Sequence, residues 1–282
     1  MTNKEQSIPK HFHFVFGLKE QLEPFHIVYY LCLKSCIEVN QPDKISFYYH
    51  YEPYGDWWEK IKHKINLVKI DLEPFVVDNK DYDSHQEGQF IKRHQLSYAH
   101  QADFVRLKVL LEHGGVYADM DTLFARPMPD SFYQHEFAIG TEGNIADEHG
   151  QPRQSLCNAL MLAQPDARFV SAWLKRMYQA FDGSWNNHSC AEAARLALKH
   201  PEQLSILPEE YFYKFSFTPQ DIDRLFKQYD PDFNNIYSIH LWNHLWWDKN
   251  RKDFSDFHAG LLTYESILKG DTTYAALAQT FL

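Results

Sequence analysis

The first 70 residues alternate short apolar runs with amphipathic stretches. Apolar runs at 11–16, 45–51 and 67–70 predict buried strands, and the apolar spacing at 24–39 and 56–65 predicts helices. Strands and helices that alternate in this order form parallel sheets joined by crossover helices. The hydrophobic pattern therefore predicts an α/β fold.

The pattern changes in the second quarter of the chain. The segment 71–95 is polar, and we expect a long surface loop or lid beside a site. A helix is expected at 97–113, where Gly114 and Gly115 end it before a short strand at 116–119. Further strands are expected at 137–140, 156–163 and 204–207, a final strand or an ordered loop at 236–242, and further helices at 166–181 and 189–199. No repeat or Gly/Ser-rich linker divides the sequence, so we expect a single domain.

Composition limits the classes of partner that the protein could bind. With 28 basic and 38 acidic residues the net charge is −10, which would repel nucleic acid and anionic membranes, so an anionic ligand would need a cation. No apolar run approaches the roughly 18 residues of a membrane span, and the polar start has no signal-peptide core, so we expect a cytoplasmic protein. The cysteines have no CxxC spacing and are expected to be buried free thiols: Cys32, Cys36, Cys157 and Cys190.

Candidate chemistry concentrates where the strand at 116–119 ends. Asp119 and Asp121 are two residues apart, and an extended backbone would point both carboxylates to one side. Carboxylates that hold Mg²⁺ or Mn²⁺ leave positions for waters and substrate phosphates, as a nucleotide diphosphate provides. A D-x-D pattern alone is weak evidence, because it also occurs at 81–83 and 221–223.

The preceding helix carries a second candidate pair. Asp103 and Arg106 are three residues apart, hence on one helix face, where an acid and a base can bind sugar hydroxyls and each other. An isolated pair of this kind is usually a surface ion pair of little consequence. Its nearness to the strand-end acids favours a functional pair.

Together, these residues form the pattern D-x-x-R, then Leu, then G-G-x-Y-x-D-x-D. The pattern resembles the GT-A glycosyltransferases with a DXD sugar-binding region, which include capsular-polysaccharide synthesis enzymes, Och-type mannosyltransferases and large clostridial toxin glucosyltransferases. The resemblance implies a GT-A type fold, a single Rossmann-like mixed sheet flanked by helices, over residues 1–282. Residues 1–125 would form the nucleotide-sugar-binding half that ends in the DXD motif, and 126–282 the acceptor-side half with a closing C-terminal segment.

The resemblance also implies roles for individual residues. Asp103 and Arg106 would contact the donor sugar, Asp119 the ribose and a metal-bound water, and Asp121 the cation itself. The opening at 8–13 resembles the family's I-P-K-x-I-H strand beside the nucleotide base, although Phe16 stands where the family often has Trp. The segment 240–247 resembles the family's terminal H-x-W segment, with an aromatic core segment as the alternative interpretation. The remaining expected site residues are Val15, Phe16, Tyr117, Trp246 and Lys249 for the donor, His240 for the metal, Trp242 for closure, and Asn158 and Glu142 for the acceptor or reaction centre.

The expected function is metal-dependent glycosyl transfer. A hexose or N-acetylhexosamine would move, with retention, from a nucleotide-sugar, UDP-linked rather than GDP-linked, with Mn²⁺ or Mg²⁺ as cofactor. Capsule or lipooligosaccharide synthesis is the expected setting, while a protein acceptor and peripheral membrane contact through a lipid-linked acceptor stay open. Two alternatives are kept: a haloacid-dehalogenase-like phosphatase, because residues 119–122 fit D-x-D-x-T, and a nucleotide-sugar-binding protein without turnover.

Overall fold

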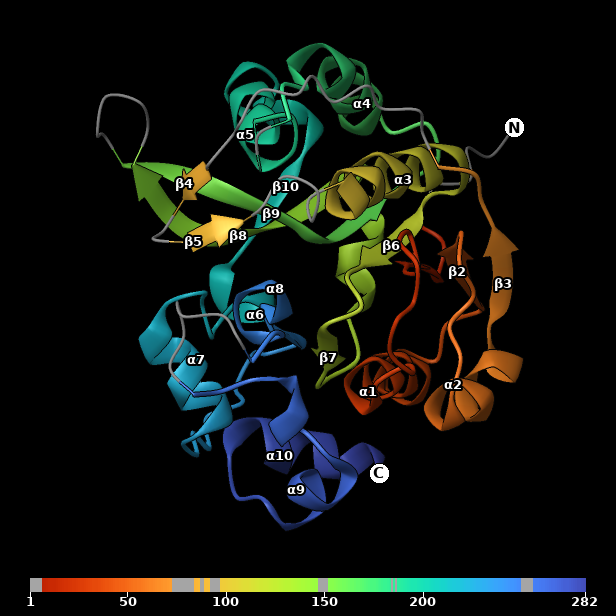
Figure 1. Cartoon of the computed structure of the whole chain (residues 1–282). Helices are drawn as coiled ribbons and strands as arrows, with labels where there is room; N and C mark the ends of the chain where they lie inside the picture. The colour runs from red at the N-terminus through yellow and green to blue at the C-terminus, as the bar shows by residue number, and fades with distance from the viewer. Residues whose placement is uncertain are drawn as a thin grey trace.

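The computed structural model describes residues 7–72, 84–86, 89–91, 97–146, 152–183, 185, 187–249 and 256–282. Its centre is a seven-stranded sheet in the order β10-β8-β9-β6-β1-β2-β3 (Figure 1). These strands are β1 (His11–Val15), β2 (Lys44–Tyr49), β3 (Asn66–Lys69), β6 (Gly115–Ala118), β8 (Phe137–Ala146), β9 (Pro152–Ala163) and β10 (Ser205–Leu207).

The sheet is mixed. Strand β1 runs parallel to β2 and β6, β2 to β3, and β10 to β8, whereas β9 is antiparallel to both β6 and β8. The parallel β-α-β-α-β start and the α/β class predicted from the hydrophobic pattern are thus confirmed.

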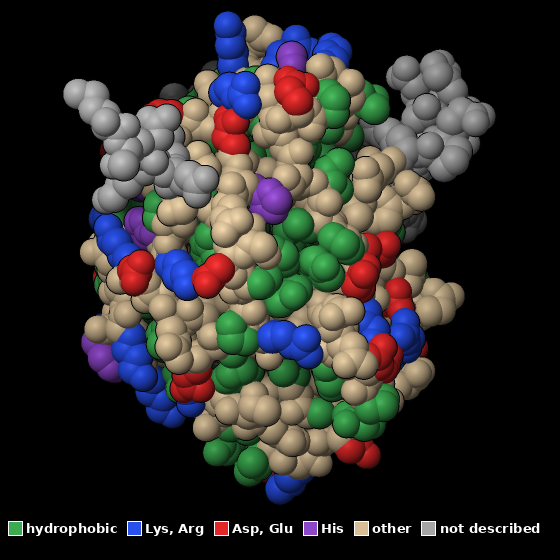
Figure 2. Space-filling model, turned by 180° about the vertical axis from the view of Figure 1, so that it is seen from behind, with side chains coloured by type: hydrophobic (Ala, Val, Ile, Leu, Met, Phe, Trp, Pro, Cys, Tyr) green, Lys and Arg blue, Asp and Glu red, His purple; other side chains and the backbone are tan. Residues whose placement is uncertain are grey.

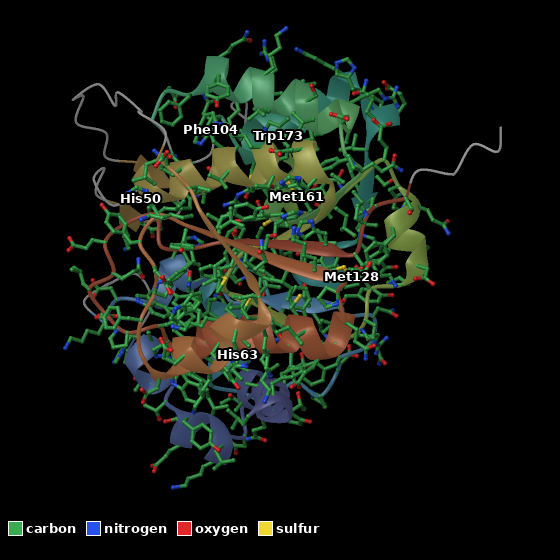
Figure 3. All side chains as sticks on the ribbon, turned by 90° about the vertical axis from the view of Figure 1, so that its right-hand side faces the viewer. His50, His63, Phe104, Met128, Met161 and Trp173 are labelled. Carbon is green, nitrogen blue, oxygen red and sulfur yellow. The ribbon has the colours of Figure 1, made fainter. Side chains whose placement is uncertain are left out.

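Helices cover both faces of this sheet, and successive residues of β1 face opposite sides. Phe12 and Phe14 belong to the core under α1 (Ile27–Ser35) and α2 (Asp56–Ile61). Val15 belongs to a second core under α3 (Ser97–His113), α4 (Arg168–Ala180) and α5 (Cys190–Lys199). Figure 3 shows two rings of this second core, Phe104 and Trp173, between α3 and α4.

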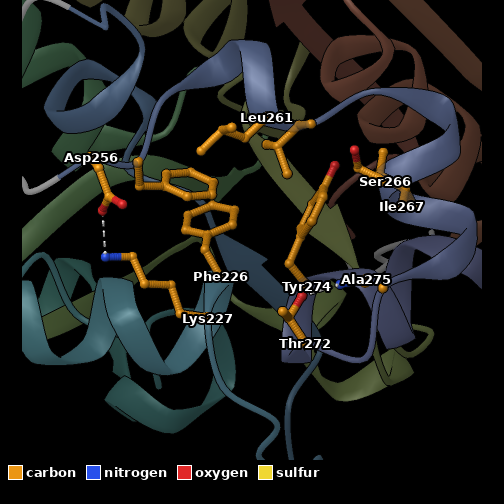
Figure 4. Close-up of a pocket in the computed structure, with 12 residues that line it drawn as sticks. Phe226, Lys227, Asp256, Leu261, Ser266, Ile267, Thr272, Tyr274 and Ala275 are labelled. Atoms are coloured by element: carbon orange, nitrogen blue, oxygen red, sulfur yellow. Dashed lines mark hydrogen bonds and ion pairs between the residues drawn. The ribbon is translucent and has the colours of Figure 1, made fainter.

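A smaller sheet and a group of short helices follow the central sheet. Strands β7 (Thr122–Phe124) and β11 (Ser238–His240) pair antiparallel. The short helices are α6 (Glu209–Phe212), α7 (Pro219–Phe226), α8 (Asn243–Trp246), α9 (Tyr264–Lys269) and α10 (Thr273–Ala278). Between α7, α9 and α10 lies a cavity of about 310 Å³ lined by Phe226, Phe257 and Tyr274 among others (Figure 4). Its lining includes none of the described site residues predicted from the sequence.

Several element boundaries differ from the predictions. The strands expected at 137–140 and 156–163 continue into the hairpin arms of β8 and β9, because there the two strands hydrogen-bond to each other beyond the apolar part of the sheet. The hairpin of β4 (Ser84–Gln86) and β5 (Gln89–Ile91) lies within the expected loop at 71–95, most of which is outside the described residues. The short helices α6 to α10 were not predicted.

The surface and the cysteines agree with the composition. On the face seen in Figure 2, acidic and basic side chains are interspersed. All four cysteines are free, as predicted, and Cys32, Cys36 and Cys157 are buried. Cys190 is only partly buried, so the burial predicted for it is wrong. Across the described residues, no helix combines the length and the apolar character needed to cross a bilayer. The cytoplasmic location and the division of one domain at residue 125 stay predictions.

Candidate functional site

The DXD motif lies on a tight turn that two glycines help to place. Gly114 and Gly115 have φ values of 62° and 102°, which L-residues rarely adopt. A Cβ atom on Gly115 would collide with the backbone oxygen of His11, so glycine allows β6 to lie close to β1. The predicted extended backbone at the motif is wrong: the amide of Thr122 donates to the carbonyl of Asp119 over 3.1 Å, closing a turn that leads into β7.

The turn brings three potential cation ligands together. Strand β11 pairs with β7 and sets His240 opposite Thr122. The Nε2 atom of His240 lies 3.1 Å from Asp121 Oδ1 and 4.0 Å from Asp119 Oδ2. One ligand atom from each of these three side chains lies within 4.8 Å of the others. Two carboxylate oxygens and an imidazole nitrogen are a donor set that fits Mn²⁺ or Mg²⁺.

Backbone groups fix Asp121 in this cluster. The amide of Asn243 donates to Asp121 Oδ2 over 2.9 Å, and the amide of Leu241 donates to the Asp121 carbonyl over 2.8 Å. These bonds and the His240 contact leave the Asp121 side chain buried. The segment after β11 is therefore a structural part of the site.

The charges of the cluster are strongly perturbed. Burial raises the pKa of Asp119, although the Arg106 guanidinium opposes this effect. For Asp121, burial acts in the same direction, but the His240 imidazole outweighs it and lowers the pKa to about 2. The pKa of His240 is raised despite its burial, because the Asp121 carboxylate stabilises its charged form. Two close carboxylates, that of Asp121 buried and that of Asp119 partly exposed, form an environment that a divalent cation would stabilise.

Arg106 joins the DXD turn to the pair on α3. Its Nη2 atom lies 3.3 Å from Asp103 Oδ1 and 3.3 Å from Asp119 Oδ1. Its guanidinium also lies over the Tyr117 ring, 4.7 Å from the centroid, and Tyr117 Oη donates to Asp119 Oδ1 over 2.6 Å. Since Asp103 and Arg106 are only 7% and 6% exposed, they are not an ordinary surface ion pair.

Asp103 is held from both sides. The amide nitrogen of Asn158 donates to Asp103 Oδ1 over 2.9 Å, while the Asn158 carbonyl accepts from Arg106 Nη1 over 2.8 Å. The Nε2 atom of His188 lies 3.1 Å from Asp103 Oδ2. Burial works to raise the pKa of Asp103, but the Arg106 charge and His188 outweigh it and lower the pKa. No local pattern in the sequence indicates His188, which lies in a polar stretch 85 residues after Asp103.

Phe16 and Val15 lie at the end of β1. Val15 is buried in the core under α3, and Phe16 packs its ring 4.6 Å from that of Tyr29. The Tyr29 hydroxyl accepts a 3.3 Å hydrogen bond from the side chain of Asn243, whose amide holds Asp121. Contacts thus connect the end of β1 to the cation cluster.

The tryptophan rings of the aromatic segment at 240–247 lie in different surroundings. Trp242 lies beside the cluster, with its ring 4.2 Å from that of His240. Trp247 stacks on Tyr29 at 4.9 Å. Trp246, however, is 0% exposed, and its Nε1 atom donates to the Leu241 carbonyl over 2.6 Å. In this conformation Trp246 has no surface from which to contact a ligand, and the described contacts do not bring it to the carboxylates.

Two further predicted site residues differ in their surroundings. Lys249 is exposed. Glu142, on β8, accepts a 2.6 Å hydrogen bond from Ser155 Oγ, and burial raises the pKa of its carboxyl. The His240 imidazole opposes this effect on the Glu142 pKa.

Sequence comparisons match the part of the chain that holds most of this site. Residues 31–138 match the family model described as "Glycosyltransferase sugar-binding region containing DXD motif", a range that includes Asp103, Arg106 and both motif aspartates. The chain is 28% identical over 253 residues to Glucan organizing enzyme 1 of Cryptococcus neoformans var. grubii, a match that covers 86% of this chain and 64% of that protein. This chain thus spans less than two thirds of that relative's length.

Solved glycosyltransferase structures match more loosely. PaToxG Glycosyltransferase aligns with a TM-score of 0.45 and 18% identity over 70% of this chain and 71% of its own. The glycosyltransferase GlyE of Streptococcus pneumoniae aligns with a TM-score of 0.49 and 12% identity over 97% of this chain and 63% of its own.

Proposed function

We propose that this chain, whose residues 31–138 match the glycosyltransferase sugar-binding region with a DXD motif, transfers a sugar from a nucleotide-sugar donor with the help of a divalent cation. The observation that carries the proposal is the position of Arg106, 3.3 Å from carboxylates of both Asp103 and Asp119. This contact joins a pair suited to sugar hydroxyls and a cluster suited to a cation in one buried site. A nucleotide-sugar presents both chemical groups on one molecule.

The cation ligands come from both halves of the chain. Asp121 and His240 would hold Mn²⁺ or Mg²⁺, and Asp119 lies close to them, with its Oδ2 atom 4.0 Å from His240 Nε2. When bound, the cation neutralises charge that builds on the departing diphosphate. We assign Val15, Phe16 and Tyr117 to the base and ribose of the donor and Lys249 to the diphosphate, although Val15 and Tyr117 are buried in this conformation.

The sugar is oriented by the α3 pair. Asp103 and Arg106 bind its hydroxyls, and Asn158 keeps both groups in place through its side chain and its backbone carbonyl. We propose transfer with retention, in which the acceptor hydroxyl attacks on the face that the nucleotide leaves and gives its proton to the departing diphosphate. A product with inverted anomeric configuration would reject this part of the proposal.

The acceptor is proposed to be a glycan, in surface polysaccharide or lipooligosaccharide synthesis, and UDP is proposed as the nucleotide. We assign Glu142 and Trp242 to the acceptor; the ring of Trp242 lies 4.2 Å from that of His240. A protein acceptor is distinguished by radiolabelled sugar transfer to protein rather than to oligosaccharide.

The test follows nucleotide release from a panel of UDP- and GDP-sugars with Mn²⁺, in the wild type, in Asp121→Asn and in Asp223→Asn. Asp223 belongs to a second D-x-D pattern, forms a 3.2 Å ion pair with Lys227 on the surface, and serves as the matched control. We expect metal-dependent release that prefers one donor, is lost in Asp121→Asn and is kept in Asp223→Asn.

The same experiment separates the alternatives. Metal-dependent donor binding without release, with every acceptor tried, would indicate a binding protein. Hydrolysis of a simple phosphate ester that is lost in Asp119→Asn would indicate a phosphatase. Neither release nor donor binding in the wild type would reject the glycosyltransferase.

A further inference from the structure

Two histidines that the proposed reaction does not use lie beside Asp103. His188 is 0% exposed and His100 is 3% exposed. His188 precedes α5, whereas Asp103 and His100 lie on α3, so the contact joins two separate elements of the chain. Of the two histidines, His188 contacts the carboxylate directly, with Nε2 3.1 Å from Asp103 Oδ2.

The surroundings of His188 fix which ring nitrogen carries its proton. Its Nδ1 atom is buried and has no hydrogen-bond partner among the described residues. The ring is surrounded by aromatic side chains, with its centroid 5.0 Å from that of Phe181 and 5.9 Å from that of Phe104. A proton on Nδ1 would be an unpaired buried donor, which is costly, so the proton belongs on Nε2, where it points at the carboxylate.

The other oxygen of Asp103 is held differently. Asp103 Oδ1 accepts from Asn158 over 2.9 Å and lies 3.3 Å from Arg106. Among the described residues, His188 is the hydrogen-bond partner of Asp103 Oδ2. Because Oδ1 alone cannot fix the plane of a carboxylate, His188 determines how the group is rotated about its Cβ–Cγ bond.

We propose that His188 is a positioning residue for sugar recognition: its Nε2–H group orients the Asp103 carboxylate toward a hydroxyl of the donor sugar without touching the donor. The inference rests on the proposed function, because it assigns Asp103 to the sugar of a nucleotide-sugar. It predicts that His188 affects affinity for the sugar and not for the nucleotide.

The test compares two substitutions with opposite chemistry. His188→Gln keeps an N–H donor near the position of Nε2, and His188→Met keeps the volume but removes the donor. Calorimetry with Mn²⁺ measures binding of the preferred nucleotide-sugar and of the matching free nucleoside diphosphate. We expect His188→Met to lower the affinity for the nucleotide-sugar about tenfold, since hydrogen bonds to charged groups are among the stronger ones. The affinity for the nucleoside diphosphate should not change. His188→Gln should restore most of the lost affinity.

The control is the same histidine-to-methionine substitution at a residue away from the site. His63 is exposed on the segment after α2 (Figure 3), and His63→Met should bind both ligands as the wild type does. Wild-type affinity for the nucleotide-sugar in His188→Met would overturn the inference alone. Equal loss of both ligands in His188→Met, or no recovery in His188→Gln, would overturn it in favour of a packing role. A wild type that binds neither ligand would overturn the proposed function and this inference with it.

One competing role for the same side chains has a separate readout. His100, Asp103 and His188 each have a potential ligand atom within 4.8 Å of the others. Thermal unfolding with Zn²⁺ alone checks this role. Stabilisation of the wild type by Zn²⁺ that His188→Met loses would overturn the positioning role in favour of a second cation site, and we expect no such stabilisation.

Discussion

The imidazole of His240 lies 3.1 Å from the Asp121 carboxylate although the two residues are 119 positions apart. The antiparallel pair of β7 and β11 creates this contact by setting His240 opposite Thr122. The site therefore depends on a strand contributed by the second half of the chain as much as on the DXD turn.

Replacing His240 should weaken cation binding although the DXD motif is kept. We expect His240→Gln to raise the Mn²⁺ concentration required for half-maximal donor binding by about 10- to 100-fold. The variant loses an imidazole that would ligate the cation and that also orients the Asp121 carboxylate, and loss of the orienting contact alone costs on this scale. A Mn²⁺ titration of donor affinity gives the measurement. His200→Gln, on an exposed histidine beside Glu202, is the control and should match the wild type. An unchanged Mn²⁺ requirement in His240→Gln would exclude His240 from the cation site.

Removing the Arg106 charge should cost stability as well as activity. Arg106→Met leaves the buried carboxylate of Asp103 and the partly exposed carboxylate of Asp119 without their shared guanidinium. We expect the free energy of unfolding to fall by about 3–5 kcal/mol, mainly through the buried Asp103. Urea denaturation without added metal measures the loss. Arg168→Met, which breaks an exposed ion pair with Glu136, should change stability far less. Equal losses in the two variants would show that the Arg106 contacts are not special.

Acid should destabilise the fold through histidines of β1. Burial lowers the pKa of His13 to about 3 and that of His11 to about 4. The neighbouring groups Lys44 on β2 and His113 at the end of α3 contribute to both of these low pKa values. Below pH 6.5 the unfolded chain takes up protons that the folded chain refuses, so stability is full above that pH and falls as the pH drops toward 4. For His13 the slope approaches about 1.4 kcal/mol per pH unit.

Denaturant unfolding between pH 7 and pH 4 tests this dependence. His13→Gln removes one of the titrating groups and should flatten the profile, even if it lowers stability at pH 7. His63→Gln, on an exposed histidine, should keep the wild-type slope. A His13→Gln profile parallel to that of the wild type would contradict the assignment.

The approach of β6 to β1 should not tolerate a side chain. Gly115→Ala adds a Cβ that meets a backbone oxygen at a φ of 102°, so we expect a loss of more than about 1 kcal/mol in unfolding free energy. Gly143→Ala also has a positive φ of 91°, but its Cβ would meet the flexible side chain of Glu209 at 3.3 Å. Chemical denaturation should therefore show a larger loss for Gly115→Ala. A smaller loss than in Gly143→Ala would contradict the backbone collision.

Local spacing accounts for the part of the site that the sequence predicts. Asp103 and Arg106 share a helix face, and the DXD motif follows an apolar strand, so their periodicity is visible in the sequence. His188 reaches Asp103 across 85 positions and has no periodic signal. Trp246 shows a further limit, because an aromatic run does not indicate which ring faces the core, and here it is this one.

The fold divides in the same way. Strands of the central sheet are apolar and were predicted near their observed positions, whereas the outer arms of β8 and β9 are polar and depend on each other's backbone hydrogen bonds. The short helices from α6 onward have too few turns for a helical period to be recognised.

The pairing of β7 with β11 has a thermodynamic consequence for the proposed cation. A chain cut before Ser238 would keep Asp119 and Asp121 and yet lose His240 together with the backbone amides that hold Asp121. If docking of this C-terminal segment raises the affinity for the cation by some factor, reciprocity requires that the cation favour docking by the same factor. Metal availability would then set how much of the C-terminal segment is protected from protease or from amide exchange, in molecules that carry no sugar at all.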